Sequence, residues 1–238
     1  PDADNLMLTT SGVGQLLLTG LQYNIGISGA EPTDALTLNG NNGDDTMTAS
    51  PGTEAIMAIT LTGGLGSDTL TGNVANLNGN EGNDTLIGGA GNQTMDGGAG
   101  DDTFVGNGGT DNVGGGAGSS IGDTILVAGT TGNDTFNISL DGAGLLLVTL
   151  NGLTTTYANF IGGPVATSGI EQILVQGFAG NDSLTVDSTN GAVPIAINFD
   201  GGNNADLLTL TGGTATSDTY QIGPNIDQGT STIVIGGV

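Results

Sequence analysis

The side chains that could do chemistry in this chain are almost all carboxylates. The sequence has 238 residues, with 24 Asp and Glu and no Lys, Arg, His or Cys. Carboxylates without basic or thiol partners suit the binding of hard divalent cations such as Ca²⁺, which takes roughly six to eight oxygen ligands. Zinc, copper and iron, which favour His and Cys, are poorly served by this composition.

The same composition argues against catalysis, because the chain has no His base, Cys nucleophile or Lys amine. A glycosidase with two carboxylates stays open in principle. Its four Glu residues, however, are scattered along the chain. Glu171, within the apolar run 170–175, is either a buried acid of raised pKa or an outward-facing strand residue. We expect a protein that is not an enzyme.

The formal charge of −24 has no cationic side chain to offset it. Self-repulsion of this size opposes a compact fold, so the charges must be spread out, protonated or neutralised by bound cations. We expect no nucleic-acid partner, because nothing in the chain can neutralise a phosphate. We also expect no membrane insertion, because no apolar run approaches the ~20 residues of a spanning helix.

The acidic residues belong to a repeat of nine residues. Large apolar side chains recur at this interval at Leu77, Leu86, Met95, Phe104 and Val113. The segments between them read LNGNEGNDT, LIGGAGNQT, MDGGAGDDT and FVGNGGTDN. Four copies in register are a strong signal of a repeat architecture.

These segments resemble the RTX nonapeptide family, whose motif is G-G-x-G-x-D-x-U-x with U a large apolar residue. The nearest matches are residues 79–86 and 97–104, and looser copies lie at 40–47, 63–70, 129–136, 177–184 and 201–208. The resemblance implies a β-roll in which turns of successive coils hold Ca²⁺ with backbone carbonyls and the motif Asp.

Several residues follow as candidate calcium ligands. Asp84 and Asp102 are expected in turns stacked on one face, with Asn78 and Asp96 flanking them. The opposite face carries Asp111, but Gln93 stands at the matching position one coil earlier, a departure from the family's pattern. The motif position in the looser copies is filled by Asp45, Asp68, Asp134, Asp182 and Asp206. The alternative for any of these is an Asx-turn, in which Asp bonds its own backbone.

The elements that position these residues must be short strands and tight turns. Gly is too frequent for helices, at a cost of roughly 1 kcal/mol per residue, and Gly and Asn suit turns that need positive φ. Phe136, Phe160, Leu184 and Leu208 repeat every 24 residues. We predict an all-β, parallel β-solenoid with central coils of 18 residues and wider flanking coils of about 24. One elongated solenoid, 1–238, would then divide softly into wide coils (1–76), a nonapeptide roll (77–126) and wide coils of period 24 (127–238).

The sequence favours an extracellular, calcium-binding structural protein, such as a self-assembling subunit of a filament, sheath or surface layer. Strand-like ends at 5–8 and 231–235 predict a homopolymer formed through the solenoid ends. Contact with a cell surface or polysaccharide is a further expected interaction. No signal peptide is recognisable, and Pro1 at the start is expected of a mature or excised chain.

Two alternatives are weighed against this interpretation. One is a non-catalytic RTX module of a larger secreted enzyme or adhesin. The other is an ice-binding protein, which resembles this chain in its repeated Thr but would carry Thr-x-Asn in its turns. That spacing occurs in the equivalent loop only at Thr131 and Asn133, so strand-favouring Thr on an outward face is the simpler explanation.

Overall fold

The computed structural model describes residues 3–22, 24–117, 122–160, 169–212, 215–222 and 229–235. Within these ranges the chain is built from strands, together with one short 3-10 turn, η1 (Thr53–Ala55). No helix in this part of the chain has the length and apolar character that crossing a bilayer requires.

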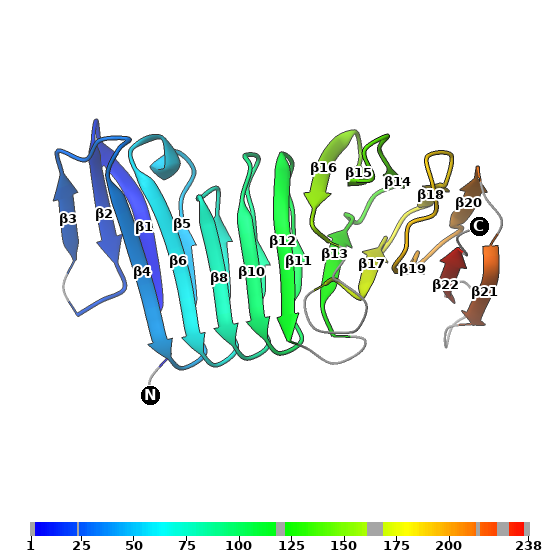
Figure 1. Ribbon diagram of the computed structural model, residues 1–238, viewed down its shortest axis with the longest axis horizontal. Helices are drawn as coiled ribbons and strands as arrows, with labels where there is room; N and C mark the ends of the chain where they lie inside the picture. The colour runs from blue at the N-terminus through cyan, green and yellow to red at the C-terminus, as the bar shows by residue number, and fades with distance from the viewer. Residues whose placement is uncertain are drawn as a thin grey trace.

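The strands form two sheets that face each other and extend along the length of a rod (Figure 1). The twelve-stranded sheet has, in spatial order, β21 (Ala215–Ile222), β22 (Gly229–Ile235), β19 (Ala196–Asp200), β17 (Gln172–Gln176), β13 (Thr124–Ala128), β11 (Thr103–Val105), β9 (Thr85–Ile87), β7 (Thr69–Gly72), β5 (Thr46–Ala49), β1 (Asn5–Gly12), β2 (Gln15–Thr19) and β3 (Ile25–Ser28). The ten-stranded sheet has β20 (Leu207–Thr211), β18 (Ser183–Asp187), β14 (Thr135–Leu140), β15 (Leu146–Leu150), β16 (Leu153–Ala158), β12 (Thr110–Ala117), β10 (Thr94–Ala99), β8 (Asn76–Glu81), β6 (Ala58–Leu65) and β4 (Ala35–Asn42).

From β4 to β13 successive strands alternate between the two sheets, and each pairs in parallel with the equivalent strand one coil later. This confirms the predicted parallel β-solenoid. The register gives coil lengths directly: the step is 18 residues from Asp84 to Asp102, 16 from Asp68 to Asp84 and 23 from Asp45 to Asp68.

The core lies between the sheets, where alternate strand residues turn inward. Leu77, Leu86, Met95 and Phe104 are fully buried and Val113 is 2% exposed. They stack on their equivalents in two columns: Leu61, Leu77, Met95 and Val113 in one sheet, Met47, Leu70, Leu86, Phe104 and Ile125 in the other. Burial of each such side chain stabilises the fold by about 1.5–3 kcal/mol.

One column of turn residues explains the Gly and Asn pattern. Asn41, Gly64, Asn80, Gly98 and Gly116 are register partners on successive coils. All five have positive φ, between 73° and 130°. Gly and Asn are the residues that tolerate this left-handed conformation at the lowest cost.

Within the described ranges, three antiparallel segments interrupt the parallel winding. β1, β2 and β3 form a meander at the N-terminal end, β14, β15 and β16 form a second, and β21 and β22 form a hairpin that pairs with β19. The second meander departs from the predicted period of 24. Phe136 pairs in parallel with Leu184, which is 48 residues later in the sequence, instead of with a residue 24 positions later. Among the described strands, the predicted 24-residue step is therefore found only from β18 to β20 and from β17 to β19.

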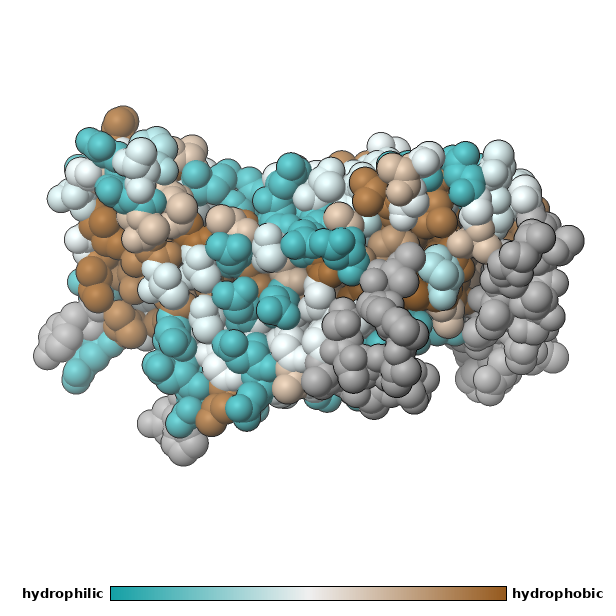
Figure 2. All heavy atoms as spheres, viewed as in Figure 1, coloured by the Kyte–Doolittle hydropathy of each residue, from teal (hydrophilic) through white to brown (hydrophobic). Residues whose placement is uncertain are grey.

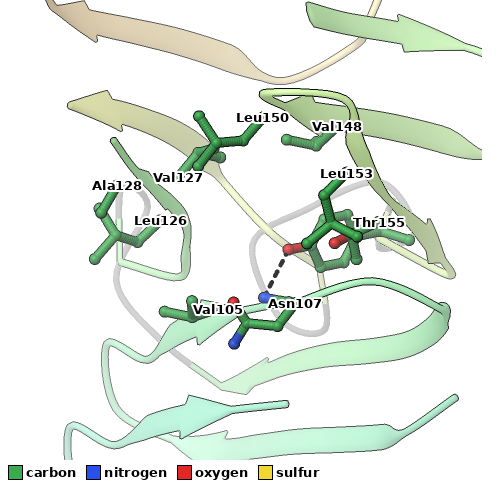
Figure 3. Close-up of a pocket in the computed structure, with 11 residues that line it drawn as sticks. Val105, Asn107, Leu126, Val127, Ala128, Val148, Leu150, Leu153 and Thr155 are labelled. Carbon is green, nitrogen blue, oxygen red and sulfur yellow. Dashed lines mark hydrogen bonds between the residues drawn. The ribbon is translucent and has the colours of Figure 1, made fainter. Parts of the chain in front are cut away.

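A cavity of about 90 Å³ lies where this meander leaves the regular coils (Figure 3). Val105, Val127, Val148 and Leu150 contribute to its mostly aliphatic lining. At its margin the buried Tyr157 hydroxyl accepts a hydrogen bond from the N–H of Gly106, 2.9 Å away. That contact fastens β16 to the turn that precedes β12.

Candidate calcium site

Two sets of turns run along the rod. The turns that lead from the ten-stranded into the twelve-stranded sheet are called here the first edge, and those that lead back are the second edge. The first edge carries Asp45, Asp68, Asp84, Asp102 and Asp123, each directly before a strand of the twelve-stranded sheet. Glu171, directly before β17, continues the series.

The acids of the first edge form a ladder. The backbone N–H of each donates to the carboxylate of the acid one coil later: Asp4, directly before β1, to Asp45 (2.6 Å), Asp45 to Asp68 (2.7 Å), Asp68 to Asp84 (2.7 Å), Asp84 to Asp102 (2.8 Å), Asp102 to Asp123 (2.8 Å) and Asp123 to Glu171 (2.8 Å). These hydrogen bonds are charge-assisted and stronger than neutral ones. The predicted stacking of Asp84 and Asp102 is thus one rung of a longer ladder.

A second row of bonds runs the opposite way. The residue before the ladder acid, Asn83 for example, accepts through Oδ1 from the N–H of Asp101 one coil later, at 3.0 Å. Asp44 accepts from Ser67 in the same manner, at 2.9 Å. At these two places neighbouring coils are therefore joined reciprocally, once through each row.

Five of the ladder carboxylates have a second oxygen without a partner. Oδ2 is buried and makes no hydrogen bond in Asp45, Asp68, Asp84, Asp102 and Asp123. These side chains are at most 1% exposed. A buried, unpaired carboxylate oxygen is costly, so something from solution, a cation or a proton, is needed to satisfy it.

The motif glycine makes room for this oxygen. A Cβ on Gly79 would overlap Oδ2 of Asp84 and lie 2.5 Å from the carbonyl oxygen of Gly97 on the next coil. Gly40 has the same surroundings, with Asp45 Oδ2 and the carbonyl of Gly63. A carboxylate oxygen and a main-chain oxygen from neighbouring coils thus face one spot above the glycine Cα.

Burial raises the pKa of Asp68, Asp84, Asp102 and Asp123. Desolvation is the largest cause for all of them, and neighbouring ladder charges add to it. The pKa of Asp84 and of Asp123 is raised to about 6, that of Asp102 to about 7, and that of Asp68 is raised as well. The Glu171 carboxylate contributes to the rise at Asp123. The fold therefore holds several carboxylates where they resist ionisation unless positive charge is supplied.

The second edge brings together other predicted residues. Gln93 N–H donates to Asp111 Oδ1 at 3.0 Å, and farther along Asp134 N–H donates to Asp182 (2.7 Å) and Asp182 N–H to Asp206 (2.9 Å). Asp134, Asp182 and Asp206 therefore lie on the opposite edge from Asp84 and Asp102. Oδ2 of Asp111 and of Asp182 is again buried and unpaired, and burial raises the pKa of Asp111 to about 6 and also raises that of Asp206.

Two residues of the second edge have no unpaired oxygen. Gln93 accepts from the N–H of Gly89 through Oε1 and donates through Nε2 to Asn73. Asp134 accepts from Asn151 Nδ2 at 2.6 Å and from the N–H of Thr130 at 2.7 Å. Burial acts to raise the pKa of Asp134, but these hydrogen bonds outweigh it and lower the pKa below its ordinary value. At these two positions, hydrogen bonds within the protein satisfy the side-chain oxygens, which a bound ion would otherwise have to do.

Asn78 and Asp96 lie away from both edges. They are register partners within β8 and β10, where Asp96 is exposed and Asn78 half-buried. Both precede the motif glycines, Gly79 and Gly97, in the sequence.

The donor set fits calcium. No group of three or more Asp, Glu, His or Cys side chains converges on one point among the described residues, so a bound ion would need main-chain oxygens as well. Unpaired carboxylate oxygens facing glycine carbonyls supply both, and these hard oxygen donors are what Ca²⁺ prefers. Asp45, Asp84 and Asp182 would hold such ions with both kinds of ligand, and Asp68, Asp102 and Asp111 would offer their unpaired carboxylate oxygens.

Sequence reasoning missed three acids of the ladder, Asp4, Asp123 and Glu171. Asp123 follows its glycine, Gly115, by eight residues rather than five, and Glu171 replaces the motif Asp. Neither fits the nonapeptide pattern. The signal that could have found Asp123 is the Asp-Thr pair at 123–124, which matches those at 84–85 and 102–103.

Comparison with known proteins agrees with this geometry. The family model of the RTX calcium-binding nonapeptide repeat matches in four copies, at residues 37–55, 60–76, 74–103 and 87–121. No curated protein and no solved structure matched the chain. The comparison therefore identifies the central coils and leaves residues 122–238 to be understood from the structure.

Proposed function

Residues 37–121 carry RTX calcium-binding nonapeptide repeats, which bind Ca²⁺ and form β-rolls, and from this premise we propose that the chain is an extracellular structural protein that calcium stiffens. One observation carries the proposal: a continuous ladder of buried carboxylates with unpaired oxygens, in a chain without Lys, Arg or His. Its countercharge must come from solution. Millimolar calcium outside cells can supply it, in keeping with the secreted location general among RTX repeat proteins.

The proposal includes self-assembly through the ends. Among the described residues the sheets end at β3 and β4 on one side and at β21 and β20 on the other. Apolar side chains are exposed there: Ile25 is 47% exposed and Leu207 is 61% exposed. Figure 2 shows hydrophobic residues gathered over the N-terminal strands. Edge strands with exposed apolar side chains favour pairing with another chain, and a head-to-tail contact propagates into a filament, sheath or layer.

We propose no catalytic activity. Catalysis at neutral pH depends mostly on groups that the composition lacks. The acid considered for a glycosidase, Glu171, instead accepts the N–H of Asp123 within the ladder.

The alternative is a non-catalytic module within a larger secreted enzyme or adhesin. The confinement of the family match to residues 37–121 favours it, since RTX blocks occur beside other domains. The mass of the native protein, isolated from its source, distinguishes the two: a chain much heavier than 23.1 kDa supports the module. An ice-binding role ranks below both, and measurable thermal hysteresis would revive it.

The test of the proposed function is calcium dependence. Removal of calcium leaves the ladder carboxylates facing one another unneutralised, and an ion that binds only the folded state stabilises it by mass action. We expect circular dichroism of the chelated protein to show loss of β-structure or a strongly lowered melting temperature. Calcium should restore both, and magnesium should do so poorly because it demands tighter octahedral geometry. An unchanged spectrum and melting temperature in excess chelator contradicts the proposal.

A further inference from the structure

The ladder continues beyond the RTX repeats at one place, where β13 lies beside β17. This place is called the seam, because Asp123 and Glu171 face each other there although 48 residues separate them. The whole β14–β16 meander lies between them in sequence. The seam is therefore where the repeat block joins the C-terminal coils along the twelve-stranded sheet.

Three hydrogen bonds place the two acids. Asp123 N–H donates to Glu171 Oε2 at 2.8 Å, and Asp123 O accepts from the N–H groups of Glu171 (3.0 Å) and Gln172 (3.2 Å). The Asp123 side chain is 1% exposed, and its Oδ1 accepts from Asp102 N–H at 2.8 Å. These hydrogen bonds hold the two acids side by side against their mutual repulsion.

Oδ2 of Asp123 has no hydrogen-bond partner and is buried. It faces the Cα of Gly115, where a Cβ would overlap both Oδ2 and the carbonyl oxygen of Gly169. A buried carboxylate oxygen and a main-chain oxygen thus point at one spot, beside a second carboxylate. These are acceptors only, so they require a cation or a proton between them.

We propose that Asp123, Glu171 and the carbonyl oxygen of Gly169 form a divalent-cation site at the seam, and that Ca²⁺ bound there fastens the C-terminal coils to the repeat block. The site rests on the proposed calcium-binding function but lies outside the matched repeats. It uses a Glu and an eight-residue spacing from Gly115 to Asp123, neither of which belongs to the nonapeptide motif. Hard oxygen donors of this kind select Ca²⁺ over softer metals.

The test compares the full chain with Glu171→Gln. The Gln carbonyl oxygen can still accept the N–H of Asp123, so the variant removes the charge and keeps the hydrogen bond. Asp141→Asn is the control, because Asp141 accepts from Ala143 and Leu145 in an exposed turn. Native mass spectrometry counts bound calcium, and hydrogen exchange reports the protection of β9, β11, β17 and β19.

We expect Glu171→Gln to bind one calcium ion fewer than the wild type and Asp141→Asn to bind the same number. Protection should fall in β17 and β19 while β9 and β11 keep theirs. If Glu171→Gln does not fold, Asp123→Asn, which keeps an oxygen for Asp102 N–H, serves in its place. Equal, non-zero ion counts in all chains would overturn the seam site alone. A wild type that binds no calcium would overturn both this site and the proposed function.

Discussion

At the scale of single residues, the ladder acids differ from ordinary turn acids in their second oxygen. Asp102 uses Oδ1 to accept Asp84 N–H and leaves Oδ2 buried and unpaired. Asp141 also caps backbone N–H groups, but it does so in an exposed turn. Only the first arrangement creates a demand for a cation.

Asp102→Asn should therefore weaken calcium binding far more than Asp141→Asn. The Asn side-chain oxygen can still accept the N–H of Asp84, so the substitution removes the negative charge and leaves the fold intact. In a calorimetric titration we expect a lost or at least tenfold weaker site for Asp102→Asn, about 1.4 kcal/mol or more. Asp141→Asn should titrate like the wild type. Equal effects of the two substitutions would mean that the ladder does not bind the ion.

The pH dependence of the calcium-free protein follows from the same acids. Their ordinary pKa is 3.8, and burial raises it to about 6 in Asp84, Asp111 and Asp123 and to about 7 in Asp102. A carboxyl that binds its proton more tightly when folded stabilises the fold at low pH, and this stabilisation is lost as pH rises through the folded-state pKa. The melting temperature of calcium-free protein should fall between about pH 4 and pH 7.

Saturating calcium should reverse that trend, because the ion binds the ionised form and competes with protons. Scanning calorimetry at several pH values, with and without calcium, measures both slopes. A calcium-free protein whose stability rises over this range would contradict the burial of the ladder.

At the scale of elements, the nonapeptide spacing predicted much and then failed for physical reasons. It placed Leu77, Met95, Leu86 and Phe104 in the core because inward side chains must repeat at the coil period. It could not predict the β14–β16 meander, because Phe136 and Phe160 keep the 24-residue spacing even though the chain between them doubles back. Each sheet of this solenoid has only one face on the core, so its strands alternate inward and outward residues whether they pair in parallel or antiparallel.

The candidate site was predictable to a similar extent. The repeat spacing alone predicted that Asp84 and Asp102 lie in stacked turns, and it also identified Asp45 and Asp68 as motif acids. It did not assign Asp182 and Asp206 to the second edge, because that depends on which sheet each turn enters. The unpaired Oδ2 atoms are likewise invisible in sequence, since they depend on the glycine beneath the carboxylate.

That glycine gives a prediction at this scale. Gly97 does not have positive φ, yet a Cβ there would overlap Asp102 Oδ2 and lie 2.6 Å from its Cγ. Gly97→Ala should cost about 1–3 kcal/mol of stability, as overpacking does, and should lower calcium affinity. Gly142→Ala, where nothing lies within 4 Å of the added carbon, should be neutral or slightly stabilising. Chemical denaturation in calcium compares them, and a neutral Gly97→Ala would show that the carboxylate lies elsewhere.

At the scale of the whole molecule, the rod has ends and a middle that differ in what they expose. Leu207, on edge strand β20, is 61% exposed, and Leu65, within the body of the rod, is 45% exposed. The two leucines are similarly exposed, but only Leu207 lies on an edge strand, whose backbone N–H and C=O groups can pair with another chain; β6, which carries Leu65, is paired on both sides. Substitutions at these two residues therefore distinguish assembly through the ends of the rod from association through any exposed apolar side chain.

Leu207→Lys should reduce assembly to the monomer, because a charged side chain on an edge strand opposes pairing with another chain. Leu65→Lys should assemble like the wild type. Light scattering and electron microscopy of calcium-loaded protein measure both. A wild type that stays a monodisperse monomer at high concentration would rule out the filament.

The strands lie across the long axis of the rod, and this orientation decides how the molecule bears tension. A force along the axis acts on the hydrogen bonds between neighbouring coils, including those of the ladder, and the successive coil-to-coil contacts bear this force in series. A coil of 18 residues adds about 4.8 Å to the axis when wound and roughly 60 Å of extended chain when released. Rupture of one rung would then release extended chain without breaking the molecule. On the proposed calcium binding, we expect the calcium concentration to set the force at which neighbouring coils separate.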